Sequence, residues 1–385
     1  MISEYRFNNV VKPILDTYNE IEDELIRNMA NAIKETDGKE LKKHTKRLLK
    51  ASQLDRQNVR TLAKYGKTTQ RQVKKAFSSI GYETIEKPLY RKAFEKKLIK
   101  KNPLEAIDNK KIAKVVDNAS KETTNYLKLI RNTARTKSKK KYLEIVNQAY
   151  LETSAGIYTP EESIKRALHR LADEGITVAQ YKRKDGSIAN YSIEGVVRRD
   201  VITRARQLAL ATQMESIKEM GVEYVSVPAH LGARVDEKNP INNHAGWQGK
   251  IYKLKGGNNK YRNFYETTGY GQMLGLGGVN CRHFFLPYIF GISRPPEKIS
   301  LEANEKVYRL EQKQRAMERD VRKWKKREMV DKINGEDEEQ LAFDKMKIRE
   351  KQKKLNKFVK SHKELKREYD REYVQELNKV EEGDE

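Results

Sequence analysis

The sequence predicts an α+β protein made of three successive regions. Apolar residues recur at helical spacing through residues 1–153, which indicates a long, basic helical N-terminal region. Residues 154–295 contain a predicted hairpin and, from residue 228 onward, more than half of the chain's 21 glycines; this is typical of a small, loop-rich α+β domain. Helical spacing returns in residues 296–385, which indicates a charged helical tail.

The N-terminal region is predicted to form four helices, because its apolar residues recur every three or four positions with charges between them. They are expected over residues 5–33, 41–65, 69–79 and 107–150. Pro13 is an alternative start for the first helix, and Asp37-Gly38 ends it. The last helix is long because no glycine or proline interrupts residues 104–155.

The middle region begins with a strong helix-start signal. Thr159 is placed as the N-cap and Pro160 as the first helical residue, and the helix should end near Gly175. Residues 176–193 predict a β-hairpin, because Asp185-Gly186 is a favoured turn dipeptide between two short apolar stretches. A helix over 194–220, stopped by Gly221, and a strand over 224–227 are expected next.

The tail shows a coiled-coil-like seam of apolar residues up to Asn334-Gly335, and a second helical run follows that break. Two helices joined by a short turn predict an antiparallel hairpin or an assembly helix. A solvent-exposed helical arm fits the same pattern, so both interpretations stay open at this point.

Composition excludes several classes of protein. A single cysteine cannot form an internal disulfide, so the chain is not a disulfide-stapled secreted scaffold. No apolar stretch approaches the length that crosses a bilayer, and the first residues lack the apolar core of a signal peptide. We therefore expect folding in a reducing cytoplasm and no membrane partner.

The net charge of +25 favours a polyanionic partner, nucleic acid first. Residues 1–150 carry 35 basic and 18 acidic side chains, a net +17. The candidate nucleic-acid contacts are Lys137, Lys139, Lys140 and Lys141. No aromatic ladder interrupts the lysine runs, which favours phosphate contacts without base reading. Lysine-rich helices that are merely solvated are the alternative.

Motifs for chemistry are sparse. Gly66-Lys67-Thr68 lacks the earlier glycine and the strand of a phosphate-binding loop, and we reject it. The paired glycines over 269–278 are expected to serve backbone turns and close approach. Arginines 198, 199, 204 and 206 form a stripe that we interpret as a solvated face unless a phosphate or an acidic partner lies there.

His230, His244, Cys281 and His283 form the one cluster with interesting chemistry. Cys281 with His283 or His244 is the only nucleophile and base combination, and nothing in its spacing is specific, so no catalytic residue is assigned. The four side chains match the ligand types and number of a structural zinc site. The spacing lacks paired ligands on the His244 side, so we favour a domain held by packing, without a cofactor, and keep zinc as the alternative. Trp247 is expected to anchor its core.

Residues 192–295 carry a series of motifs whose order is distinctive. The motif residues are Arg198, Arg199, Asp200, His230, Arg234, His244, Trp247, Gly249, Gly269, Gly271, Asn280, Cys281, Arg282 and His283. In this order they resemble the phage minor capsid protein 2 family. That family is related to head-morphogenesis proteins of tailed phages, in which Asn-Cys-Arg-Cys often stands near the end of the domain. This chain has His283 at the last position, which departs from a cysteine-based metal site.

The resemblance implies a structural minor head protein of a tailed phage or prophage. Its implied partners are the portal and capsid proteins and packaged double-stranded DNA, bound without sequence preference. Its implied location is the capsid interior, with host cytoplasm during assembly.

Two other functions compete with the minor head protein. The first is an enzyme carried in the phage head, such as an ADP-ribosyltransferase-like toxin or transferase. We find no matched Arg, Ser-Thr-Ser and Glu triad, which argues against activity. The second is a general nucleic-acid-binding protein unconnected with virions, which only the basic charge supports.

Overall fold

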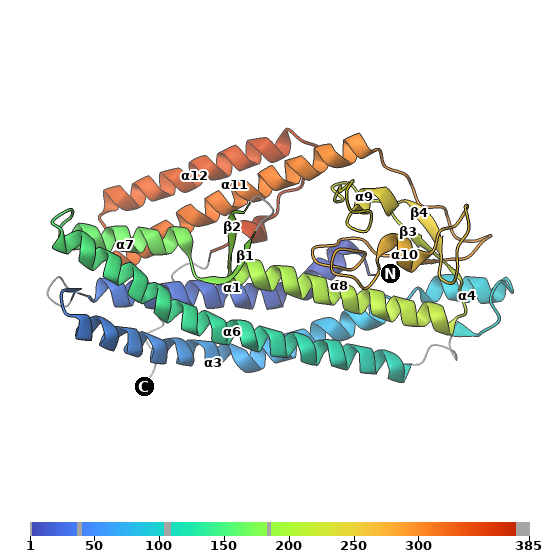
Figure 1. Ribbon diagram of the computed structural model, residues 1–385, viewed down its shortest axis with the longest axis horizontal. Coiled ribbons are helices and arrows are strands. Elements are labelled where there is room, and N and C mark those ends of the chain that lie inside the picture. The colour runs from blue at the N-terminus through green and yellow to red at the C-terminus, as the bar shows by residue number, and fades with distance from the viewer. Residues whose placement is uncertain (1, 37–40, 104–108, 183–185, 375–385) are drawn as a thin grey trace. The chain divides into compact units, whose positions relative to one another are not determined.

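The structure is a computed structural model that describes residues 2–36, 41–103, 109–182 and 186–374. Its helices are α1 (Glu4–Lys34), α3 (His44–Glu83), α4 (Lys87–Glu95), α6 (Asn109–Ser154), α7 (Pro160–Glu174), α8 (Ile193–Glu219), α9 (His244–Trp247), α10 (Phe264–Thr268), α11 (Leu301–Asn334), α12 (Glu338–Lys360) and the short 3-10 helix η1 (Tyr369–Glu372) (Figure 1). Its strands are β1 (Thr177–Lys182), β2 (Ile188–Ser192), β3 (Tyr224–Val227), β4 (Lys250–Lys253) and β5 (Leu286–Tyr288). Long helices and two small antiparallel sheets confirm the predicted α+β class.

The chain divides into two compact units, each assembled from three separate segments. The first unit comprises Met1–Ile14, Thr69–Tyr126 and Arg198–Gln312. The second comprises Leu15–Thr68, Leu127–Val197 and Lys313–Glu385. Each unit thus draws on all three regions that the sequence pattern distinguishes. The predicted boundaries near residues 154 and 296 fall at the end of α6 and before the start of α11.

The N-terminal helices are longer than the positions of proline and glycine in the sequence predict. Helix α1 runs through Pro13, so its alternative start at that residue is wrong. Helix α3 continues through Gly66, where we predicted a break between two helices. A glycine inside a helix costs about 1 kcal/mol relative to alanine. Burial of Leu62 before it and Val73 after it outweighs that cost, since an aliphatic side chain contributes about 1.5–3 kcal/mol when buried.

The local signals of the middle region are confirmed. The Thr159 side chain accepts a hydrogen bond from the Glu162 backbone N–H, and the Glu162 carboxylate accepts one from the Thr159 backbone N–H. This capping box starts α7, and Gly175, with φ at 59°, ends it. Strands β1 and β2 pair antiparallel as predicted. Residue Asp185 of the predicted turn lies outside the described residues.

The first unit contains the loop-rich part of the chain, around a three-stranded sheet. Strand β3 lies in the centre and pairs antiparallel with β4 on one side and β5 on the other. Its Val225 and Val227 are buried. Trp247 at the end of α9 is only 2% exposed, and its indole N–H donates to the Ile241 carbonyl oxygen at 3.1 Å. Trp247 is therefore buried in this core, as its expected anchoring role requires.

The second unit contains long helices and the β1–β2 hairpin, and polar contacts lie buried between its helices. The buried hydroxyl of Tyr18 on α1 donates to the Leu127 carbonyl oxygen of α6 at 2.9 Å. The buried carboxylate of Glu22 on α1 pairs with the ammonium of Lys326 on α11 at 2.9 Å. The Lys326 charge helps to hold the pKa of Glu22 below its ordinary value, against the opposing effect of burial. A charge at this depth needs its partner, because unpaired buried charges are strongly destabilising.

The tail forms a helical hairpin. Val321 on α11 packs against Leu355 and Val359 on α12, and Met317 and Leu365 extend this cluster. The turn lies at Asn334-Gly335, as the sequence predicts, and Gly335 has a φ of 80°. Of the two interpretations of the tail, the hairpin is therefore correct for its described residues.

A buried acid pair links the two helices of this hairpin. The carboxyl of Asp344 on α12 shares a hydrogen bond with Asp331 on α11, and His169 on α7 contacts both Asp331 oxygens at 2.7 and 3.0 Å. Burial, together with this hydrogen bond and the Asp331 charge, raises the pKa of Asp344 to about 7. The folded protein therefore holds a proton on this pair at a pH where an exposed aspartate has lost it.

This raised pKa predicts a pH-dependent stability. A carboxyl whose pKa is higher in the folded state stabilises the fold fully below its unfolded pKa, and that contribution is lost as pH rises through about 7. Thermal unfolding should show the wild-type melting temperature falling between pH 5 and pH 8. The Asp344→Asn variant should lose much of that fall, whereas Asp320→Asn, on the half-exposed side of α11, should keep it. An unchanged pH dependence in Asp344→Asn would contradict the assignment.

The burial of Trp247 predicts a large loss on truncation. Trp247→Ala should lower the free energy of unfolding by about 3–5 kcal/mol, because it removes a buried ring and its hydrogen bond. Chemical denaturation measures this loss. The half-buried Trp324 of the tail hairpin supplies the matched variant, Trp324→Ala, which should lose less. A loss below about 1 kcal/mol in Trp247→Ala would contradict its role as the anchor of this core.

Candidate functional site

Glycines shape the backbone around the candidate site. A Cβ on Gly275 would stand 2.1 Å from the Gly269 carbonyl oxygen, and one on Gly278 would stand 2.2 Å from the Met273 carbonyl oxygen. Real Cβ atoms do not approach this closely, so only glycine fits. Gly269 also ends α10 in the left-handed conformation, with φ at 59°. The predicted backbone role of this glycine series is confirmed.

The structure brings three of the four predicted ligand candidates together. His244 begins α9, and Cys281 and His283 lie on the segment that leads into β5. All three side chains are buried, and one ligand atom from each lies within 4.8 Å of the other two. The Cys281 Sγ is 3.7 Å from the His283 Nδ1. The sequence spacing of 37 residues between His244 and Cys281 hides this proximity.

Hydrogen bonds fix which nitrogen of each ring carries the proton. The His283 Nε2 lies 2.8 Å from the Gln248 side-chain oxygen, which can only accept, so Nε2 carries the proton. The His244 Nε2 lies 2.8 Å from the Leu274 carbonyl oxygen and donates in the same way. In the neutral ring the other nitrogen, Nδ1, is then the acceptor. The His283 Nδ1 lone pair thus lies beside the Cys281 thiol.

Burial keeps these groups uncharged. It lowers the pKa of His244 to about 4 and moves that of His283 well below its usual value. The same effect raises the pKa of the Cys281 thiol. A nucleophilic cysteine needs the thiolate and access to substrate, and this thiol, which is 3% exposed, has neither. The Cys281–His283 contact therefore does not form a catalytic pair.

His230, the fourth candidate, stacks on the cluster from outside. Its ring centroid is 4.1 Å from that of His283. Its Nδ1 lies 2.9 Å from the Leu231 carbonyl oxygen, and its Nε2 is buried with no hydrogen-bond partner among the described residues. Burial lowers its pKa, so the ring is neutral and Nε2 is an acceptor.

The arginine stripe of α8 has acidic partners inside the first unit. Arg206 is buried and forms two contacts with Glu4 of α1, at 2.5 and 2.8 Å. Arg199 pairs with Asp200 at 3.3 Å, and both are half-buried, as is Arg198. The exception that we allowed, an acidic partner, therefore holds for Arg206, because an internal carboxylate occupies its guanidinium.

The remaining motif residues hold loops in place. Arg282 makes a bidentate ion pair with Glu311 of α11 at 3.0 and 2.9 Å and also contacts the Gly232 carbonyl oxygen. Arg234 donates to the Asn242 side chain and to the Val279 carbonyl oxygen. Other motif residues adopt special backbone conformations, with positive φ at Gly249, Gly271 and Asn280. These contacts are structural in kind.

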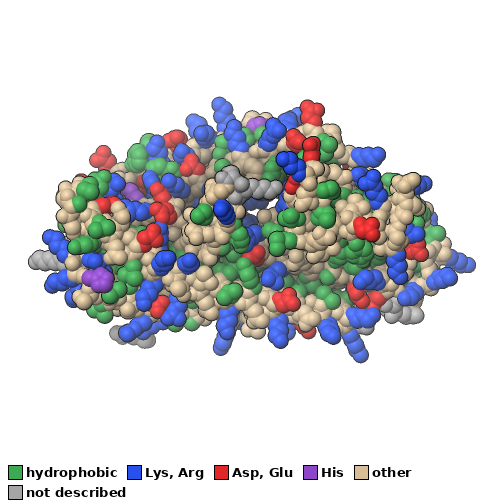
Figure 2. Space-filling model, viewed as in Figure 1, with side chains coloured by type: hydrophobic (Ala, Val, Ile, Leu, Met, Phe, Trp, Pro, Cys, Tyr) green, Lys and Arg blue, Asp and Glu red, His purple; other side chains and the backbone are tan. Residues whose placement is uncertain are grey.

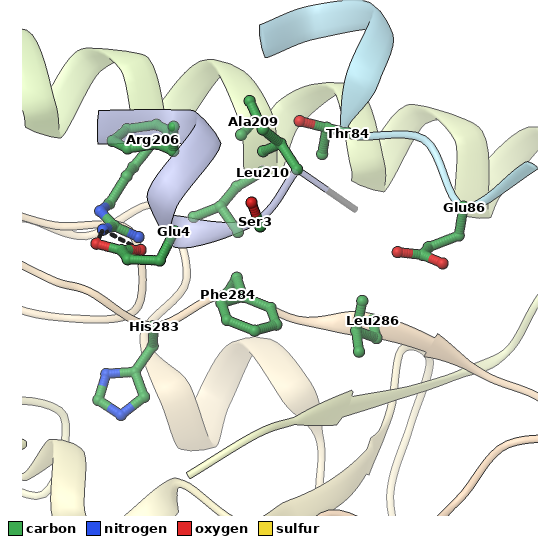
Figure 3. A pocket seen from close by; sticks show the side chains of 12 residues that line it. Ser3, Glu4, Thr84, Glu86, Arg206, Ala209, Leu210, His283, Phe284 and Leu286 are labelled. Atoms are coloured by element: carbon green, nitrogen blue, oxygen red, sulfur yellow. Dashed lines mark hydrogen bonds and ion pairs between the residues drawn. The ribbon is translucent and has the colours of Figure 1, made fainter. Parts of the chain in front are cut away.

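Sequence reasoning missed a cavity of about 430 Å³ in the first unit. Its polar end is the Arg206–Glu4 pair, and its walls include Leu210, Phe284 and Leu286 (Figure 3). His283 borders this cavity, but its ring points away from the other labelled side chains in Figure 3. The contributing residues are far apart in sequence, so no local signal could have identified the cavity.

The predicted lysine cluster of α6 is not a single patch. Successive helical residues point about 100° apart, so four neighbouring lysines surround the helix. Lys140 is exposed, whereas Lys137, Lys139 and Lys141 are half-buried, and Lys141 contacts Glu144 and Glu174. Figure 2 shows many Lys and Arg side chains projecting from the visible surface.

A different row of basic residues, not identified from the sequence, lies on α3. Its members in the second unit are Arg56, Arg60, Lys64 and Lys67, which we call the α3 basic stripe. Spacings of four, four and three residues place them on one helical face, and all four are exposed. The same spacing continues along the helix to Arg71 and Lys74. Helical periodicity of charge, rather than local charge density, was the signal that could have found it.

Comparisons with known proteins identify relatives along most of the chain. The family described as phage minor capsid protein 2 matches residues 2–360. A structural protein of Lactococcus phage LL-H is 27% identical over 354 residues, which cover 84% of this chain and 90% of that protein. A structural protein of Lactococcus phage mv4 is 34% identical over 119 residues, which cover 30% of this chain and 94% of that protein. No solved structure matches.

None of the helices in the described ranges combines the length and apolar character of a membrane-spanning segment.

Proposed function

Because the chain belongs to the phage minor capsid protein 2 family, we propose that it acts in the head of a tailed phage or prophage, next to the portal, and contacts packaged double-stranded DNA without sequence preference. Family membership makes it a structural protein of the virion and not an enzyme. Portal association, an interior location and DNA contact are the parts that we add.

The α3 basic stripe carries the proposal of DNA contact. Its four cationic groups extend over about 16 Å of helix, at a rise of about 1.5 Å per residue. Within the described residues none of the four has an ion-pair partner, and the adjacent Asp55 is already paired with Arg135 at 2.7 Å. Unpaired cations in a row are suited to a strand of phosphates, because each contact releases a condensed counterion.

The surroundings of the stripe favour backbone contact over base reading. The aromatic residue between its members is Tyr65, which is half-buried and donates a hydrogen bond to the Glu24 carboxylate at 2.5 Å. It is therefore not presented for stacking on a base. Phosphate contacts alone carry no sequence information, which agrees with a protein that meets packaged DNA of any sequence.

Helix α12 offers a comparable row, consisting of Lys345, Arg349, Lys353 and Lys357, all exposed. Acidic residues surround it: Lys347 pairs with Glu350 and Lys351 pairs with Asp320. Residues 301–385 carry 24 basic and 22 acidic side chains, a net +2, against +17 for residues 1–150. Because non-specific binding follows the summed local field, we assign DNA contact to α3.

The salt dependence of DNA binding tests this assignment. Replacing Arg56, Arg60, Lys64 and Lys67 together by glutamine should weaken binding to a random-sequence duplex. Each lost phosphate contact lowers the slope of log K against log salt by about 0.9, so the four-fold variant should lose about 3.6 of that slope. Fluorescence anisotropy over a salt series measures both quantities.

The matched control replaces Lys345, Arg349, Lys353 and Lys357 by glutamine, which removes the same charge from α12. Its slope should stay within about one contact of the wild type. An equal loss in both variants would show that net charge alone, rather than the α3 face, governs binding. Wild-type binding that does not respond to salt would contradict phosphate contact altogether.

Cross-linking mass spectrometry of purified particles and procapsids tests the location. Cross-links from this protein to the portal protein should appear in both, and the protein in intact particles should resist added protease. Cross-links confined to the outer capsid surface, or digestion in intact particles, would contradict an interior, portal-associated position.

A further inference from the structure

We propose that His244, Cys281 and His283 form a zinc site that fastens the loop-rich part of the first unit. The three ligands come from two chain segments, the α9 helix and the segment before β5. A metal shared by them would tie these segments together where glycine-rich turns supply little apolar core. The proposal is independent of DNA contact and rests on different residues.

The first argument is the geometry of the ligand atoms. Zinc binds thiolate sulfur at about 2.3 Å and imidazole nitrogen at about 2.0–2.1 Å, which separates two tetrahedral ligands of these types by about 3.6 Å. The Cys281 Sγ and the His283 Nδ1 are 3.7 Å apart. All three candidate atoms lie within 4.8 Å of one another, so a small side-chain movement of His244 completes the set.

The second argument is that the outer hydrogen bonds are those of a metal site. Histidines that ligate metals almost always donate their other ring N–H to a carbonyl or carboxylate, which fixes the tautomer. His283 donates to the Gln248 amide oxygen and His244 to the Leu274 carbonyl oxygen, both at 2.8 Å. The His283 ring consequently directs its Nδ1 lone pair at the Cys281 thiol, 3.7 Å away.

The third argument is the neighbouring acceptor. Three protein ligands leave the fourth tetrahedral position to a solvent molecule. His230, stacked on His283, has a buried Nε2 acceptor without a partner among the described residues, and such a molecule would give it one.

Soft and nitrogen ligands together favour zinc over calcium or magnesium, which take oxygen ligands. The spacing of the residues in the sequence favours packing over a zinc site, because only Cys281 and His283 form a close pair. The folded arrangement favours the zinc site instead, since it brings in His244 from a segment 37 residues away in sequence.

Zinc binding by the full chain, prepared without a histidine tag and stripped with chelator, tests the proposal. After addition of Zn²⁺ and desalting, atomic spectrometry should find one zinc per chain. Cys281→Ser and His244→Gln should each weaken the zinc affinity at least 100-fold, whereas the exposed His44→Gln should leave it unchanged. Less than half a zinc per wild-type chain, or full affinity in Cys281→Ser, would overturn the site.

Cobalt substitution keeps the test decisive if a variant fails to fold. Wild-type protein loaded with Co²⁺ should show a thiolate-to-cobalt charge-transfer band in the near ultraviolet, together with visible bands of tetrahedral intensity. Because the chain has one cysteine, such a band reports Cys281 as the ligand. Absence of the band in folded wild-type protein, verified by circular dichroism, would also overturn the proposal.

Discussion

The side-chain oxygen of Gln248 is the acceptor on which the loop-rich part of the first unit depends. It accepts the backbone N–H of His230 at 3.0 Å and the Nε2 proton of His283 at 2.8 Å, so both of its lone pairs are used. One amide thus sets the position of one loop and the tautomer of a buried ring. The ring stacking of His230 on His283 and the contact between His283 and Cys281 both follow from that choice.

The glycine-rich segment provides the second half of this arrangement. The Leu276 backbone N–H donates to the Thr268 carbonyl oxygen at 2.9 Å, and this closes a tight fold of the chain between them. Gly275 allows the backbones to approach, since any side chain would collide with Gly269. The Leu274 carbonyl oxygen is then available to the His244 ring. Side-chain chemistry at the cluster therefore depends on residues that have no side chain.

How far the sequence predicts this structure depends on the range of the interactions involved. The capping box of Thr159 and Glu162 is local, and the helix it starts is placed correctly. The break expected at Gly66 fails because distant partners bury the residues on either side of it. The tail hairpin could be narrowed to two interpretations, and only the packing of Val321 on Leu355 selects one.

The candidate site follows the same rule. Its residue types are visible in the sequence, and the resemblance to a phage family is carried by the same motifs. The sequence does not show which of these residues lie close together, because the fold of the intervening loops brings His244 near Cys281. The pairing of Arg206 with Glu4, 202 positions away, is equally hidden. The lysine run of α6 shows the reverse case. Its residues are neighbours in sequence, but they point in different directions around the helix and do not form one patch.

The assembly of each unit from three segments has a consequence for synthesis on the ribosome. The first unit needs residues up to 312, and the second needs Glu22 of α1 to meet Lys326 of α11, 304 positions later. Contacts of such long range close slowly and late in folding. The early helices must therefore wait, partly unpaired, while the rest of the chain emerges at about 5–20 residues per second. Translation itself sets the earliest moment at which a copy can be competent to join a capsid.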